Sequence, residues 1–254
     1  IGIKRIADFA EQLNIYTSPE ELLSLSLGSS ETTLLKLTTA YCIFVNGGKL
    51  INPKFIDRIQ DSEGNTIFNS EKRECDGCDQ ISYSSKKIPK IKNNFKQIMS
   101  RETAYQMTSI LEGTVKRGTA KGLRDLNLDL GGKTGTTNNN TDTWFIGFSS
   151  NLVIGVYVGY DEPSSLGKFE TGARTAMPIF KDFVKNTVKK ENARPFKIPQ
   201  GIKMLVVNSE TGKRASYNDE SIIIEAFKEK DLINNKIQYG NIDYISIENI
   251  YKFY

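Results

Sequence analysis

The stretch GGKTGTTNNNTDTWFIGFSSNLVIGVYVGY, residues 131–160, carries the strongest structural signal in the chain. Two apolar runs, Thr143–Phe148 and Leu152–Tyr160, flank the polar turn Ser149-Ser150-Asn151. Strand-length apolar runs on either side of a short polar turn predict an antiparallel β-hairpin. Lys133-Thr134-Gly135-Thr136 opens into this hairpin, so we expect the tetrapeptide to lie on or just before a further strand.

Apolar residues at helical spacing occur before and after this predicted hairpin. Helices are expected from Ile3 to about Asn14, from a cap at Ser29 or Ser30 to a stop at Gly47-Gly48, from a cap at Ser100 to Gly118, and from about Ala176 to Lys189 with Pro178 in the first turn. The residues expected to face inward are Leu34, Leu35, Leu37, Tyr41 and Val45 in the second helix, and Met107, Ile110, Leu111 and Val115 in the third. This order of elements favours an α+β fold, an antiparallel β-sheet with helices packed on it.

Further strands and a linker suggest how the chain is divided. The additional strands are expected at Phe55–Ile59, Thr66–Phe68, Ile202–Val207 and Ile222–Ala226. Pro195–Pro199 has the composition of a linker. We therefore expect one domain over residues 1–194 and a β-rich C-terminal extension over residues 195–254.

Composition excludes several kinds of chemistry. The chain has 254 residues, 34 Lys and Arg against 30 Asp and Glu, and no histidine. Ser-His-Asp triads, Cys–His dyads and zinc sites built on histidine are excluded, so proton transfer near neutral pH falls to a lysine, carboxylate, tyrosine or thiol. The small net charge does not indicate a nucleic-acid partner, and no apolar run is long enough for a membrane span. We expect neither a cofactor nor a metal.

The N-terminus and the cysteines carry less information. The chain begins at Ile1, and Ile1–Ala10 lacks a signal-peptide pattern, so we expect a piece of a longer protein.

Cys75 and Cys78 form a C-x-x-C pair, for which a local disulfide and two inert thiols are the main interpretations. A zinc site lacks ligands, and a thioredoxin-like motif lacks its βαβ context. Cys42 is expected to pack as a small hydrophobe.

The tetrapeptide at 133–136 is the best candidate for a functional site. On a strand, Lys133 would share a face with Gly135, and Thr134 would share the other face with Thr136. Two hydroxyls and a cation this close suit a carboxylate ligand, and a strand at a cleft edge can bind an extended peptide. A glycine-rich turn with a surface lysine remains the alternative on this segment alone. A phosphate-binding loop is disfavoured because Asn127 stands where that motif needs its first glycine.

The wider context resembles a known family. The motifs in order are Leu25-Ser26-Leu27-Gly28, Thr32-Thr33-Leu34-Leu35, Ala40-Tyr41, Asn46-Gly47-Gly48, Gly118-Thr119, Lys133-Thr134-Gly135, Asp142–Phe148, Gly155–Asp161 and Glu170–Ala176. This succession is similar to the C-terminal half of the transpeptidase domain of class A (bifunctional) penicillin-binding proteins, over about Ile1 to Gly201. Lys-Thr-Gly is one of the motifs of the penicillin-recognising serine enzymes. The resemblance implies an incomplete transpeptidase fold of the β-lactamase-like type, at the periplasmic face of the bacterial inner membrane.

The resemblance also implies a reaction and residue roles. Family members cross-link peptidoglycan: a serine in an S-x-x-K motif attacks a D-Ala–D-Ala bond of a stem peptide, and β-lactams acylate the same serine. It implies that Lys133 lines the cleft and that the Thr134 and Thr136 hydroxyls hold the terminal carboxylate of the peptide or β-lactam. Gly135 would leave room for substrate, and the Thr136 backbone N–H would be one of two oxyanion-hole donors.

Two motifs of the family do not occur in their expected places. Ser84-Ser85-Lys86-Lys87 matches S-x-x-K but lies in the polar, lysine-rich segment Glu71–Asn94, and Ser216-Tyr217-Asn218 matches S-x-N but follows the Lys-Thr-Gly motif. We therefore expect this chain alone to be inactive, and to bind stem peptides and β-lactams only when an upstream segment completes the site. The alternatives are a non-catalytic binding remnant of the same fold and a complete hydrolase that uses another serine, such as Ser84.

Overall fold

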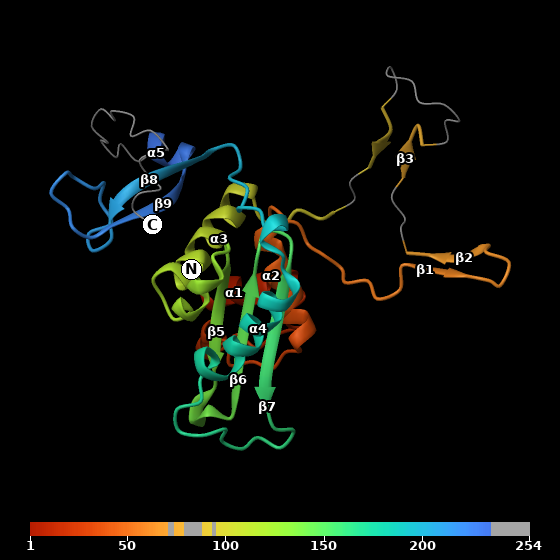
Figure 1. Ribbon diagram of the computed structural model, residues 1–254, viewed down its shortest axis with the longest axis horizontal. Helices are drawn as coiled ribbons and strands as arrows, with labels where there is room; N and C mark the ends of the chain where they lie inside the picture. The colour runs from red at the N-terminus through yellow and green to blue at the C-terminus, as the bar shows by residue number, and fades with distance from the viewer. Residues whose placement is uncertain (71–73, 79–87, 93–94, 235–254) are drawn as a thin grey trace.

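A three-stranded antiparallel sheet forms the centre of the structure, a computed structural model that describes residues 1–70, 74–78, 88–92 and 95–234 (Figure 1). The strands, in spatial order, are β5 (Gly131–Thr136), β6 (Asp142–Phe148) and β7 (Val153–Gly159). The register pairs Lys133 with Ile146 and Gly135 with Trp144. The predicted hairpin, the strand position of the tetrapeptide and the α+β class are therefore confirmed.

Helices cover both faces of this sheet (Figure 1). They are α2 (Leu34–Val45) and α3 (Arg101–Lys116) on one side, and α4 (Met177–Thr187) on the other. Glycines in the strands allow the close approach: a Cβ on Gly155 would lie 2.0 Å from the Thr38 hydroxyl of α2. On the opposite face, a Cβ on Gly147 would lie 2.4 Å from the Phe180 ring of α4. The helices therefore pack against the strand backbone itself.

The main hydrophobic core lies between the sheet and α4. Its buried members are Val115, Ala120, Leu123, Leu126, Leu130, Phe145, Ala176, Met177, Phe180 and Val184. The rings of Phe145 and Phe180 meet edge to face with their centroids 5.0 Å apart, a favourable geometry for aromatic pairs. The short 3₁₀ helix η2 (Lys121–Leu126) adds Leu123 and Leu126 to the core. A smaller cluster of Leu13, Ala40 and Ile43 joins α1 (Ile3–Gln12) to α2.

The ends of the helices agree in part with the sequence prediction. Ser100 caps α3 as predicted, since its hydroxyl accepts a hydrogen bond from the Thr103 amide at 3.2 Å. The predicted cap of α2 at Ser29 or Ser30 is wrong, because Thr33 accepts from the Lys36 amide instead. Ser29 instead closes the preceding 3₁₀ helix η1 (Leu23–Leu27), because its amide donates to Ser24 O at 3.3 Å, and the chain stays non-helical until Thr33.

Two residues predicted to face inward are exposed. Leu35 in α2 is 45 % exposed and Ile110 in α3 is 55 % exposed. In α3 the buried row runs through Ala104, Thr108, Leu111 and Val115, which places Ile110 on the far side of the helix. The prediction counted apolar residues, whereas the helix buries small and polar ones where it crosses the sheet closely.

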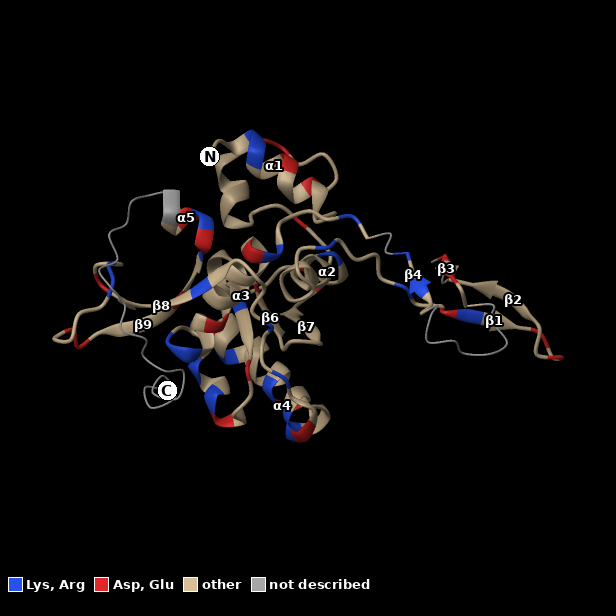
Figure 2. Cartoon of the chain, turned by 90° about the horizontal axis from the view of Figure 1, so that it is seen from above, with Lys and Arg blue, Asp and Glu red and all other residues tan. Residues whose placement is uncertain are grey.

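An arm of short strands projects from the central body (Figures 1 and 2). It contains β1 (Arg58–Gln60), β2 (Thr66–Asn69), β3 (Cys75–Asp76) and β4 (Lys90–Ile91). The predicted turn between β1 and β2 is present: the Asp61 carboxylate accepts hydrogen bonds from the Asn65 side chain and from the backbone amides of Asn65 and Glu63, and these bonds lower the pKa of Asp61. Cys75 and Cys78 form a disulfide, which decides between the two interpretations of that pair. Ser84 and its S-x-x-K segment lie outside the described residues.

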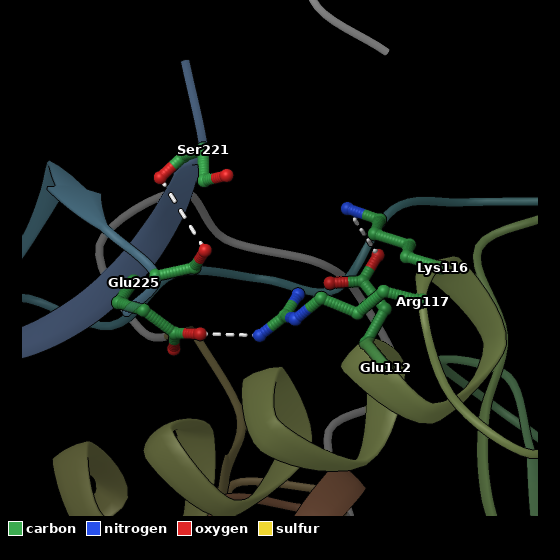
Figure 3. Close-up of polar contacts among 6 residues, drawn as sticks. Glu112, Lys116, Arg117, Ser221 and Glu225 are labelled. Atoms are coloured by element: carbon green, nitrogen blue, oxygen red, sulfur yellow. Dashed lines mark hydrogen bonds and ion pairs between the residues drawn. The ribbon is translucent and has the colours of Figure 1, made fainter. Parts of the chain in front are cut away.

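The C-terminal strands form a separate hairpin that packs on α3. β8 (Ile202–Asn208) and β9 (Ile222–Lys228) confirm the two predicted strands; they pair antiparallel and lead into α5 (Glu229–Asn234). The Gln106 side chain donates to Ala226 O at 3.0 Å, and Arg117 forms an ion pair with Glu225 (Figure 3). Residues 235–254 lie outside the described residues, and a domain division at residue 194 stays a prediction.

Cys42 in α2 is half-buried and carries no disulfide, and burial raises the pKa of its thiol. This fits the expected role as a small packing residue. In the part of the chain that the structure describes, no helix has the length and apolar character needed to cross a membrane.

Replacing Phe180 with alanine is expected to lower the free energy of unfolding by about 3–5 kcal/mol, because the ring is fully buried between α4 and the sheet. Phe183→Ala provides the matched control: this ring is in the same helix but 48 % exposed, and its loss should cost less than about 1 kcal/mol. Urea unfolding of the three proteins measures both effects. Equal costs for the two variants would contradict the assigned core.

Candidate functional site

The Lys-Thr-Gly segment lies on β5, at an edge of the three-stranded sheet. The amide of Thr137 donates to Asp142 O at 3.2 Å, toward β6. Because backbone groups alternate along an antiparallel strand, the N–H and C=O groups of Gly132, Thr134 and Thr136 point toward the outer edge. Among the described residues no strand pairs with this edge. The edge therefore presents backbone groups, such as the Thr136 N–H, that a ligand can reach.

Lys133 lies on this edge with an exposed side chain. Its ammonium donates to Thr134 O at 2.7 Å, so the positive charge rests beside an outward-facing carbonyl. The carbonyl of the preceding residue, Gly132, also has a partner: it accepts a hydrogen bond from the Thr114 hydroxyl of α3 at 2.7 Å. Sequence analysis gave no role to Thr114, because its contact with β5 depends on how α3 packs.

The two threonine hydroxyls of the motif lie on the other face of β5, as strand alternation predicts. The Thr134 hydroxyl is 3.4 Å from the Thr119 hydroxyl, which follows α3. The Thr136 hydroxyl accepts a hydrogen bond from the Gly172 amide at 3.1 Å. Thr119 and Gly172 belong to motifs that the sequence pointed out, but their contacts with the strand could not be read from it.

Gly135 lies between the two threonines and has a close neighbour. A Cβ on Gly135 would stand 3.1 Å from the Trp144 Cβ of β6. The Trp144 ring is fixed in turn by a hydrogen bond from its Nε1 to Asp142 Oδ1 at 3.0 Å and by the edge of the Tyr157 ring. A side chain at position 135 would therefore press on a held tryptophan.

Partly buried acidic and phenolic side chains, Glu112 and Tyr105, lie on α3. Burial raises the pKa of the Glu112 carboxyl, although an ion pair with Lys116 at 3.0 Å opposes the shift (Figure 3). Burial, with Glu112 and Asp129 nearby, raises the pKa of Tyr105 to about 12. A Cβ on Gly131 would lie 3.2 Å from the Glu112 backbone nitrogen, so α3 packs closely on the beginning of the Lys-Thr-Gly strand.

The other serine motif lies elsewhere in the structure. Ser216-Tyr217-Asn218 forms part of the loop between β8 and β9, which projects away from the sheet (Figures 1 and 2). Tyr217 is fully exposed, and the Ser216 amide donates to Asp219 Oδ2 within the same loop at 2.7 Å. The structure therefore does not bring this segment to β5.

Thr143 adds a hydroxyl beneath the site. It lies on β6 directly opposite Thr136 and is fully buried. Its hydroxyl has no hydrogen-bond partner among the described residues. A buried hydroxyl without a partner carries a desolvation cost of about 1–3 kcal/mol, so this position is destabilising for the fold.

Thr143→Val is expected to raise the free energy of unfolding by about 1–2 kcal/mol, because it keeps the side-chain shape and removes the unpaired hydroxyl. Chemical denaturation measures the change. Thr108→Val is the matched control: that threonine is also buried, but its hydroxyl contacts Ala104 O and Phe44 O, so the same replacement should be destabilising. A loss of stability in Thr143→Val would show that its hydroxyl is satisfied.

Comparison with known proteins now identifies the class. The family described as "Penicillin binding protein transpeptidase domain" matches residues 7–185. The chain therefore belongs to the penicillin-binding protein transpeptidase family, and the predicted resemblance is confirmed.

Named relatives agree with this assignment. The chain is 38% identical to penicillin-binding protein 1A of Rickettsia felis, over 96% of this chain and 32% of that protein. It is 40% identical to penicillin-binding protein 1A of Rickettsia prowazekii, over 96% of this chain and 30% of that protein. A crystal structure of penicillin-binding protein 1A from Haemophilus influenzae matches with a TM-score of 0.71 and 27% identity, over 89% of this chain and 36% of that one. The chain thus spans about a third of the length of these relatives.

Proposed function

We propose that this chain provides the Lys-Thr-Gly wall of a D,D-transpeptidase site that cross-links peptidoglycan and binds β-lactams. One observation carries the proposal: β5 presents Lys133, Thr134 and Thr136 along an edge that no described strand occupies. Membership of the transpeptidase family supplies the reaction class.

Recognition of the donor begins with its carboxylate. Thr134 and Thr136 share one face of β5, two residues apart, so both hydroxyls can donate to one anionic group. The Lys133 ammonium is at the same edge, and a charge-assisted contact is about twice as strong as a neutral one. A peptide ending in a free carboxylate, or a β-lactam that carries one, has the charge and reach that this arrangement favours.

Stabilisation of the reaction intermediate uses the strand backbone. The Thr136 N–H points outward from the edge by strand alternation. In the proposed role it donates to the carbonyl oxygen of the scissile bond as negative charge develops there. Removal of one such donor typically slows catalysis by about 10²–10³. The second donor in the family pattern belongs to the nucleophile.

The nucleophile itself must come from another segment. The chain has no S-x-x-K or S-x-N motif in the family place, and Ser216 belongs to the loop between β8 and β9, a hairpin separate from the central sheet. This chain has no histidine, so among its own residues at the site we assign proton transfer to Lys133. We therefore propose that this chain alone turns over neither stem peptides nor β-lactams.

The proposed location is the periplasmic face of the bacterial inner membrane. Peptidoglycan stem peptides are assembled into the wall there, and the relatives are named as penicillin-binding proteins. The Cys75–Cys78 disulfide supports an oxidising compartment, since disulfides persist there and are rare in the cytosol.

Fluorescent penicillin tests the proposed function directly. The chain alone is expected to show no covalent label on a denaturing gel. A hybrid in which the part of the Rickettsia felis relative that precedes its matching segment is joined to this chain is expected to be labelled. Label on the chain alone would contradict the proposal. A folded hybrid without label would favour the alternative, a non-catalytic binding remnant.

Within that hybrid, Thr134→Val should slow acylation by benzylpenicillin roughly 10- to 100-fold, because it removes one hydrogen bond to a charged group. Thr137→Val is the matched control: this threonine directly follows the motif, and its hydroxyl bonds to Thr141 and to the Asp142 backbone in the turn that leads to β6. Acylation reactions quenched at successive times give both rates. Equal slowing by the two replacements would argue against a specific role for Thr134.

A further inference from the structure

Gly172 contacts the Lys-Thr-Gly strand from a distant part of the chain. It begins the five-residue π-helical segment η4 (Gly172–Ala176), which continues into α4. Its amide donates to the Thr136 hydroxyl oxygen at 3.1 Å. A hydroxyl can accept through its lone pairs while its own hydrogen points to a different acceptor. The Gly172 amide therefore leaves the Thr136 hydroxyl to act as a donor.

The packing around Gly172 fixes this contact. A Cβ at position 172 would lie 2.4 Å from Trp144 O and 2.7 Å from Gly135 O. Both atoms belong to strand backbone and cannot move aside as a flexible side chain could. Only glycine therefore lets η4 rest on the β5–β6 pair at the rung next to Thr136.

The start of η4 is held by its own hydrogen bonds. The amides of Arg174 and Thr175 both donate to Thr171 O at 2.9 Å. The Thr175 hydroxyl also donates to the Glu170 carboxylate. These bonds define the turn that aims the Gly172 amide at β5, so the geometry does not depend on the ligand.

We propose that Gly172 is a positioning residue that orients the Thr136 hydroxyl as a donor toward the carboxylate of the donor peptide or β-lactam. This inference rests on the proposed function. Gly172 itself touches no substrate in this scheme. It acts through Thr136, and its effect must therefore disappear when the Thr136 hydroxyl is absent.

A double-mutant cycle in the hybrid protein tests that dependence. The readout is the second-order rate of acylation by benzylpenicillin. Gly172→Ala should slow acylation roughly three- to tenfold, the value of about one hydrogen bond. Thr136→Val should slow it as well, and adding Gly172→Ala to that variant should change the rate less than twofold. In a Thr136→Ser background, which keeps the hydroxyl, Gly172→Ala should again slow acylation.

Gly122→Ala is the control for a glycine substitution in general. A Cβ there would meet only the flexible end of Met177, at 3.1 Å. It should leave the rate within twofold of the parent. A Gly172→Ala rate within twofold of the parent, or effects that multiply in the double variant, would overturn the inference.

Hydrogen–deuterium exchange provides a second test that needs no acylation and no change at Gly172. The amide of Gly172 should exchange several-fold faster in Thr136→Val than in Thr136→Ser, because only serine retains an acceptor. Equal exchange in the two variants would overturn the inference. This exchange measurement tests the contact between Gly172 and Thr136 even if the Gly172→Ala variant does not fold, because it leaves Gly172 unchanged. A hybrid that shows the exchange difference without penicillin labelling would remove the proposed function and leave the contact in place.

Discussion

The Phe180 ring of α4 occupies the space that a side chain at Gly147 would otherwise fill. This contact sets how closely α4 approaches the central strand of the sheet, and it brings the ring against Phe145. On the other face, Gly155 allows the same approach by α2. The glycines in the strands thus determine how closely the helices pack on each face of the sheet. Strand β5, and the site it carries, keeps its position because β6 is clamped from both sides.

The site depends on contacts between segments far apart in the sequence. Thr114 reaches Gly132 from α3, and Gly172 reaches Thr136 from the segment before α4. Each contact links one end of β5 to a helix that packs on the sheet. The strand is therefore held near both ends, while no described strand pairs with its outer edge. Positioning of this kind favours binding, because little order has to be gained when a ligand arrives.

The sequence predicted those features that depend on local pattern. The hairpin of β6 and β7 followed from apolar runs around a polar turn, and the cap at Ser100 followed from residue type and position. The predicted cap of α2 was wrong because Ser29 closes η1 through a bond from its amide to Ser24 O. The predicted inward position of Ile110 was wrong because α3 buries small and polar residues instead. The segment Lys133–Thr136 was recognised as a candidate site from its residue types and its place before the hairpin. The contact between Gly172 and Thr136 joins residues 36 apart in the chain, and no local pattern reports such a contact.

The hydrogen bonds at the outer edge of β5 have a consequence for solubility. An open strand edge is a template for pairing with a second copy of the same strand, and natural proteins protect such edges with lysine or by covering the backbone groups. Here the Thr114 hydroxyl lies on the carbonyl of Gly132, and the Lys133 ammonium lies on that of Thr134. Two successive outward carbonyls thus accept hydrogen bonds from side chains of the same chain. Two copies brought edge to edge would also place their Lys133 charges close together, which is repulsive. The polar groups that shape the site therefore also protect the strand from edge-to-edge aggregation.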